Sequence, residues 1–172
     1  MSNLIVLTVV SDDHPGVVES LSDLIVSHGG NWAESSMMSL AGKFAGILLV
    51  QMPAEKADDF IATLEAMKSK GIHIVAQHSD SASSMDAARE YSIELVGQDR
   101  PGIVREITTV LAKHGVNVQE LETTVQSASM SGESLFIAHA RILIPPQAEL
   151  EKLQGELEDL ANELMVDIEL ET

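Results

Sequence analysis

The sequence lacks cysteine altogether, and only 3% of its residues are aromatic. Without cysteine the chain cannot form a disulfide, a thiolate zinc site or a thiol nucleophile. The aromatic residues are too few to build a platform on which nucleic-acid bases stack. No apolar run reaches the roughly 18–20 residues of a membrane-spanning helix, and the first residues lack the basic segment of a signal peptide. We therefore expect a cytoplasmic protein.

Basic side chains are also scarce. The 172 residues contain 10 Lys and Arg against 27 Asp and Glu, which gives a formal net charge of −17. Residues 1–85 carry 4 basic and 10 acidic side chains, and residues 86–172 carry 6 and 17. Binding to phosphate groups requires a basic face, and an anionic membrane repels an acidic surface. The charge therefore argues against direct binding to nucleic acid or to an acidic membrane.

The chain contains an internal repeat with an offset of 86 residues. Leu7–Glu34 aligns with Ile93–Glu120, and nine of these 28 positions are identical. The identical pairs are Val10/Val96, Asp13/Asp99, Pro15/Pro101, Gly16/Gly102, Val18/Val104, His28/His114, Gly29/Gly115, Asn31/Asn117 and Glu34/Glu120. A repeat of this length is a whole domain rather than one turn of a solenoid. We expect one domain over residues 1–80, a linker over 81–89, and a second domain over 90–172.

Each copy has the same order of apolar patterns. In the first copy we predict a buried strand at Leu4–Val10, a helix that begins at Pro15 and ends at Gly29, strands at Asn31–Leu40 and Phe44–Met52, a helix between Pro53 and Gly71, and a strand at Ile72–Gln77. In the second copy we predict Tyr91–Val96, Ile103–His114, Val116–Val125, Leu135–Ile144, a helix faced by Leu150, Leu153, Leu157 and Leu160, and Met165–Leu170. The order β-α-β-β-α-β predicts the α+β ferredoxin-like fold, with an antiparallel sheet and both helices on one face.

The face of each sheet opposite the helices is predicted to be half apolar. In the second copy it would carry Leu135, Ile137, His139, Arg141 and Leu143, because side chains alternate along a strand. Such a face indicates that the domains pair with each other or with another chain, and we expect a homo-oligomer. His139 and Arg141 fit either a partner contact or a solvated strand. In the first copy we interpret Met37 and Met38 as strand core.

The loop between the first strand and the first helix holds the densest identity. It reads Asp13-His14-Pro15-Gly16 in one copy and Asp99-Arg100-Pro101-Gly102 in the other. A helix N-terminus offers free N–H groups to a carboxylate, and an aspartate beside it can accept from an ammonium group. A purely structural interpretation stays open, in which Asp caps the turn, Pro begins the helix and Gly packs tightly. Asn31 and Asn117 follow at matched distances and could address either end of an amino acid.

These motifs resemble the ACT domain, a small-molecule regulatory module, because Asp-x-Pro-Gly is followed by a helix and then by His-Gly-x-Asn. Two copies without a catalytic domain resemble the glycine cleavage system transcriptional repressor family. The resemblance implies a non-enzymatic regulator that binds a small amino acid, glycine or serine, at an interface between modules and contacts a transcription activator protein. It implies ligand contacts from Asp13 and Asn31 and from Asp99 and Asn117, although serine-binding members often have Asn where this chain has Asp. The alternative is a ligand-free ACT adaptor or regulatory subunit that controls a metabolic enzyme.

Motifs of common enzymes are missing from the sequence. There is no Gly-x-Ser-x-Gly, no phosphate-binding Gly-Lys-[Ser/Thr] and no His-Glu-x-x-His. We expect no catalytic activity and no cofactor. We also expect no metal site, because His14, His28 and His114 lack the spacing of metal ligands. His28 and His114 are expected at the C-terminal end of a helix, where a protonated imidazole would meet the helix dipole.

Overall fold

The computed structural model of the chain describes residues 2–79, 87–128, 130 and 132–172. The chain divides into two compact units, Met1–Ser83 and Ser84–Thr172, which we name unit 1 and unit 2. Residues 81–86 of the predicted linker 81–89 lie outside the described residues. Each unit has its own four-stranded sheet and its own hydrophobic core.

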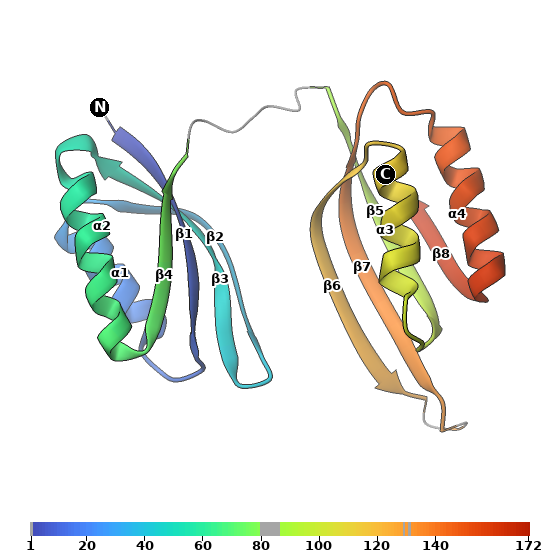
Figure 1. Cartoon of the computed structure of the whole chain (residues 1–172), viewed down its shortest axis with the longest axis horizontal. Coiled ribbons are helices and arrows are strands. Elements are labelled where there is room, and N and C mark those ends of the chain that lie inside the picture. The colour runs from blue at the N-terminus through green and yellow to red at the C-terminus, as the bar shows by residue number, and fades with distance from the viewer. Residues whose placement is uncertain (1, 80–86, 129, 131) are drawn as a thin grey trace. The chain divides into compact units, whose positions relative to one another are not determined.

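Unit 1 has the predicted β-α-β-β-α-β order (Figure 1). Its elements are β1 (Ser2–Asp12), α1 (Val17–Ser27), β2 (Asn31–Leu40), β3 (Lys43–Pro53), the 3-10 turn η1 (Ala54–Lys56), α2 (Ala57–Ala66), the 3-10 turn η2 (Met67–Lys70) and β4 (Ile72–His78). The strands are ordered β2-β3-β1-β4, and every neighbouring pair is antiparallel. The α+β ferredoxin-like prediction is therefore confirmed for this unit.

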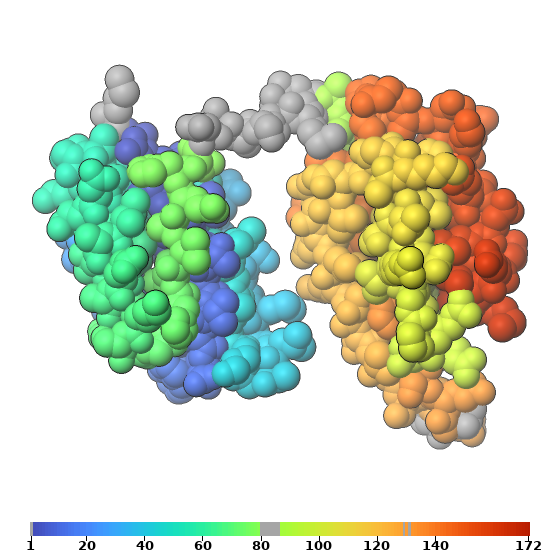
Figure 2. Space-filling model, viewed as in Figure 1, coloured from blue at the N-terminus to red at the C-terminus, as the bar shows by residue number. Residues whose placement is uncertain are grey.

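Unit 2 repeats the arrangement. Its elements are β5 (Arg89–Gln98), α3 (Ile103–Lys113), β6 (Asn117–Ser127), β7 (Ser134–Ile144), α4 (Leu150–Leu164) and β8 (Val166–Glu171). The strand order is β6-β7-β5-β8, again antiparallel throughout. The helices α3 and α4 lie side by side on one face of the sheet (Figure 1), and in the space-filling view their yellow and orange-red atoms adjoin (Figure 2).

The cores follow from the periodicity of the apolar residues. In α1 the buried positions are Val17, Leu21 and Ile25, the spacing that gives a helix one apolar face. In α2 the ring of Phe60 is completely buried. On β1 the inward residues Ile5, Leu7 and Val9 are completely buried, while their neighbours are more exposed. This alternation leaves the other face of the sheet without a covering helix in the described part of the unit.

The repeat extends to an irregularity of the backbone. A β-bulge interrupts the pairing of β2 with β3 between Trp32 and Glu34, and an equivalent bulge interrupts β6 and β7 between Val118 and Glu120. These positions differ by the same 86 residues. A bulge inserts one unpaired residue and so changes which side chains face the core. The interpretation of Met38 as core is therefore wrong, because Met37 packs against the core and Met38 is 54% exposed on the outer face.

Candidate functional site

The repeated loop follows the first strand of each unit and leads into the first helix. Pro15 does not begin the helix, because α1 begins at Val17 and Gly16 occupies its N-cap position. The corresponding helix α3 begins at Ile103 after Gly102. Neither cap position provides a side-chain hydrogen bond, so the predicted capping of the turn by aspartate is also not observed there. The first-turn N–H groups of both helices are therefore without a capping side chain.

Gly16 and Gly102 are required for the shape of this loop. Their φ angles are 95° and 97°, in the left-handed region that side chains with a Cβ rarely adopt. A Cβ built at either glycine meets no atom within 4 Å. Tight packing, the structural interpretation of these glycines, is thus wrong. The glycines instead expose bare backbone beside a helix N-terminus, which is the arrangement that admits an anionic group.

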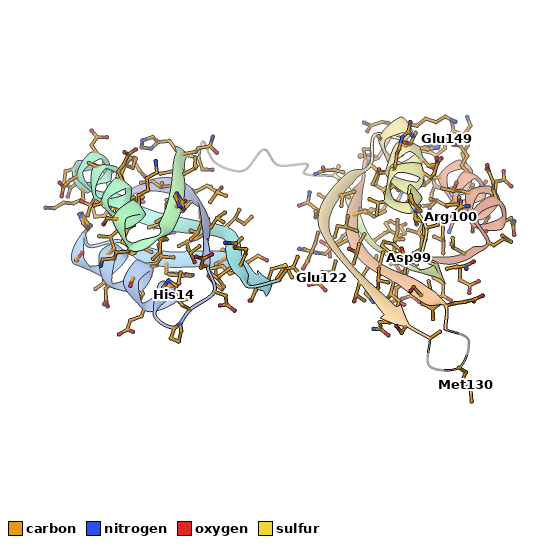
Figure 3. The ribbon with its side chains drawn as sticks, turned by 60° about the horizontal axis from the view of Figure 1, so that its bottom comes forward. His14, Asp99, Arg100, Glu122, Met130 and Glu149 are labelled. Carbon is orange, nitrogen blue, oxygen red and sulfur yellow. The ribbon has the colours of Figure 1, made fainter. Side chains whose placement is uncertain are left out.

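The aspartates of the two loops have different surroundings. The Ser39 hydroxyl donates a 2.6 Å hydrogen bond to Oδ2 of Asp13. Residue 125, the counterpart of Ser39, is a valine, and the side chain of Asp99 has no hydrogen-bonding partner among the described residues of unit 2. Arg100 lies next to Asp99 in the exposed loop, where unit 1 has His14 (Figure 3). Asp99 is therefore the more available acceptor for a ligand ammonium group.

The two asparagines do not lie beside the loop of their own unit. Asn31 pairs with Gln51, which is level with Leu4 of β1, whereas Asp13 follows the far end of that strand at Asp12. Eight residues separate Leu4 from Asp12, and at ~3.3 Å per residue this places the two groups about 26 Å apart. Asn117 is likewise level with Glu90, at the opposite end of β5 from Asp99. One amino acid cannot contact both groups of the same unit.

The histidines at the ends of α1 and α3 connect the two helices of each unit. His28 and His114 are the C-cap residues. Nε2 of His28 lies 3.3 Å from Oδ2 of Asp59 on α2, and Nε2 of His114 lies 3.4 Å from Oε2 of Glu156 on α4. Both histidines occupy equivalent positions and meet a carboxylate of the second helix. These contacts agree with the structural role expected for the two histidines. The carboxylate partners could not be identified from the repeat, because Asp59 and Glu156 lie beyond it.

Lys113 strengthens the contact in unit 2. Its ammonium group donates to both carboxylate oxygens of Glu156 at 2.9 Å. This hydrogen bond holds the pKa of Glu156 below its usual range, with a smaller contribution from His114. Glu156 therefore stays ionised in the folded unit at neutral pH.

A groove of about 460 Å³ lies on the outer face of the unit 2 sheet. Arg141 is one of its lining residues, and its guanidinium nitrogens lie 3.1 Å from Glu120 and 3.5 Å from Glu90. His139 is 3.4 Å from Glu94. Glu122 also lines the groove and projects from β6 on the side away from the helices (Figure 3). Acidic groups outnumber the single arginine, so this groove favours a positively charged partner over an anion.

Two further classes of site find no support in the described part of the chain. No group of three or more His, Asp or Glu residues there is arranged to hold a metal ion. None of the helices described is long and apolar enough to span a membrane.

Comparison with known proteins identifies both units. Family models of the ACT domain match residues 3–77 and residues 91–160. A UPF0237 protein of Methanopyrus kandleri is 34% identical over 85 residues, which are 46% of this chain and 92% of that protein. A second UPF0237 protein, from Methanosarcina mazei, is 30% identical over 84 residues, covering 46% of this chain and 90% of its own. The share of each chain indicates that these relatives correspond to about one unit.

Solved structures resemble the whole chain. The crystal structure of an unknown protein from Galdieria sulphuraria has a TM-score of 0.84 and 31% sequence identity, covering 99% of this chain and 98% of that one. A candidate glycine cleavage system transcriptional repressor has a TM-score of 0.69 at 18% identity, covering 99% and 96%. At this lower identity the likeness concerns the fold. The chain consists of two tandem ACT domains and belongs to the ACT-domain family.

Proposed function

We propose that this protein is a non-enzymatic cytoplasmic regulator that responds to a small amino acid and acts by contact with another protein. The observation that carries the proposal is the pair of ACT domains, each with an exposed loop that ends in a glycine of positive φ at a helix N-terminus. Glycine or serine is the ligand favoured by the resemblance described above.

The chemistry of the loop matches the two ends of an amino acid. The ligand carboxylate would accept hydrogen bonds from the first-turn N–H groups beside Gly102 or Gly16. Asp99 or Asp13 would accept from the ammonium group. The loop of unit 2 is the better candidate, because Asp99 is not engaged by a neighbouring hydroxyl and Arg100 adds a positive charge.

The distance between each asparagine and the loop of its own unit limits how Asn31 and Asn117 could contact a ligand. Since each asparagine lies at the far end of the sheet from its own loop, a ligand held by a loop would meet an asparagine only from another ACT module. This agrees with the interface location that the resemblance implies. A primary amide provides both a donor and an acceptor, so it can complete either end of the ligand's hydrogen bonding.

The proposed output is repression of glycine cleavage system transcription through an activator protein. The fold likeness to a candidate repressor of that system supports this choice. The formal net charge of −17 is unsuited to direct contact with DNA. The acidic groove around Arg141 offers a surface for a basic patch of the activator.

A second candidate is a ligand-free adaptor or regulatory subunit of a metabolic enzyme. It is favoured by one observation in unit 1, where the carboxylate of Asp13 already accepts a hydrogen bond from Ser39. A loop used only for structure would keep such an internal contact and bind no amino acid.

A thermal-shift screen of the full chain against the twenty amino acids separates the two candidates. A ligand at 100 times its dissociation constant stabilises the folded state by about 2.7 kcal/mol, which raises the melting temperature by several degrees. We expect this for glycine or serine, whereas no shift at millimolar concentration would favour the adaptor. A mobility-shift assay with promoter DNA tests the output, since we expect no submicromolar binding unless an activator is added.

A further inference from the structure

The outer faces of the two sheets differ sharply in composition although the folds are the same. Among the described residues of unit 1, seven large hydrophobic side chains are exposed, and five of them lie on the outer face of its sheet. These five are Val10, Met38, Leu40, Ile47 and Val75. Among the described residues on the outer face of unit 2, Val96 is the only large hydrophobic side chain that is exposed.

The register brings the apolar residues of unit 1 together across all four strands. Val10 is opposite Ala45, which is in turn opposite Met38. One row further along, Ile47 and Val75 flank Thr8 from either side. The half-buried side chains of the next row, Val6 and Leu49, extend the surface. Polar side chains on this face are Thr8 on the central strand and Ser36, His73 and Gln77 on the two edge strands. We name this surface, from Val6 to Leu40, the apolar face.

The outer faces of the two sheets also differ in charge. The apolar face has Glu34 near one end and, at the other, Asp12 paired with Lys43. The outer face of unit 2 has Arg141 among seven acidic residues: Glu90, Glu94, Glu120, Glu122, Asp167, Glu169 and Glu171. Two chains of net charge −17 repel each other, so contact between copies is most favourable where the surface is nearly neutral.

We infer that the apolar face is a homodimer interface at which the unit 1 sheets of two copies pack face to face. Contiguous exposed apolar surface of this kind marks an interaction site. A flat, nearly neutral apolar surface is complementary to itself, as a two-fold interface requires. The acidic face of unit 2 is an unsuitable occupant, because its carboxylates would lose hydration against Val and Ile without a partner.

The whole outer face of the unit 1 sheet, of which the apolar face is the main part, just reaches the area that such a dimer needs. Its four strands, spaced ~4.8 Å apart, and the eight residue steps from Leu4 to Asp12 give a face of about 19 by 26 Å. Two such faces remove on the order of 1,000 Å² from water, which is the lower limit for a specific interface. The inference concerns assembly alone and does not rest on the proposed function.

The repeat supplies a matched pair of variants for the test. Val10 and Val96 are equivalent outward residues of the central strands, 43% and 39% exposed. Val10→Glu would place a carboxylate at the centre of the apolar face of each copy, and we expect the dimer dissociation constant to rise by roughly a hundredfold or more. Val96→Glu adds the same charge to unit 2 and should leave the dimer unchanged. Ile47→Glu, at a 55% exposed position, should act like Val10→Glu.

Sedimentation equilibrium of the full chain from about 5 to 200 μM measures the result, with far-UV circular dichroism to verify that each variant is folded. The expected outcome is a dimer for the wild type and for Val96→Glu, and a monomer for Val10→Glu and Ile47→Glu. The inference is overturned by a wild type that stays monomeric, which would point to another occupant of the face. It is also overturned if Val10→Glu and Ile47→Glu remain dimeric, or if Val96→Glu alone dissociates.

Discussion

Replacement of Gly102 by alanine tests whether the candidate loop has the backbone described above. Gly102 has a φ of 97°, and a Cβ at this position would meet no atom within 4 Å. The substitution therefore costs only backbone strain, and a non-glycine residue in the left-handed region loses roughly 1–2 kcal/mol. For a unit of this size 1 kcal/mol lowers the melting temperature by about 4–8 °C. We expect a loss of this order for Gly102→Ala.

Gly155 provides the matched control in the same unit. It lies within the helix α4, its φ is not positive, and a Cβ there also meets nothing within 4 Å. Because alanine is a better helix former than glycine, Gly155→Ala should stabilise unit 2 by about 0.5–1 kcal/mol. The two substitutions add the same methyl group without a clash, so an opposite sign isolates the effect of the backbone.

Urea denaturation monitored by far-UV circular dichroism gives both changes in the free energy of unfolding. Trp32 is the only tryptophan and lies in unit 1, so its fluorescence in the same samples reports whether the other unit is disturbed. We expect the Trp32 transition to be unchanged in both variants. If Gly102→Ala is as stable as the wild type, the glycine is not held at positive φ and the proposed bare backbone at the helix N-terminus is wrong.

Two further predictions concern stability. Phe60→Ala empties a completely buried position in the core of unit 1 and should lower the free energy of unfolding of this unit by about 3–5 kcal/mol. Urea denaturation followed by Trp32 fluorescence measures the change, and a loss below about 1 kcal/mol would contradict the assigned packing. The hydrogen bond from Lys113 lowers the pKa of Glu156 in the folded unit below its ordinary value of 4.5, so this contribution to stability is present above pH 4.5 and is lost as the pH falls through the lowered pKa. The melting temperature of wild type should therefore exceed that of Glu156→Gln above about pH 5, and the difference should shrink in acid; a gap that is constant with pH would show that ionisation is not its cause.

The repeat and its element order were sufficient to predict the fold. Two copies of β-α-β-β-α-β dictate antiparallel sheets with helices on one face, and the predicted strand Asn31–Leu40 agrees with β2 at both ends. Local errors arose where a single residue changes the pattern. The bulge after Trp32 could not be inferred from alternation alone, and it places Met38 on the outer face instead of in the core.

The candidate site was less predictable, for two different reasons. The position of Gly16 at the N-cap depends on its positive φ, which a Pro-Gly pair permits but does not impose. The distance between Asp13 and Asn31, in contrast, could have been predicted from the element order. The strands β1 and β2 run in the same direction, so the start of β2 at Asn31 lies beside the start of β1, whereas Asp13 follows the end of β1. The equal spacing of the aspartate and the asparagine in the two copies suggested that they lie close together, although the strand directions exclude this. The contact between Ser39 and Asp13 follows from the same geometry.

The measurement that tests the proposed function most directly is calorimetric titration of the full chain with glycine and with serine. We expect one of them to bind the wild type, and Asn117→Ala or Asn31→Ala to weaken binding by about ten- to a hundredfold, the loss of one charge-assisted hydrogen bond of roughly 1.5–3 kcal/mol. Gln77→Ala, which removes an exposed amide on the opposite edge strand β4, should bind like the wild type. No heat of binding at millimolar concentration would contradict the account, and equal affinity in all four proteins would place the ligand elsewhere.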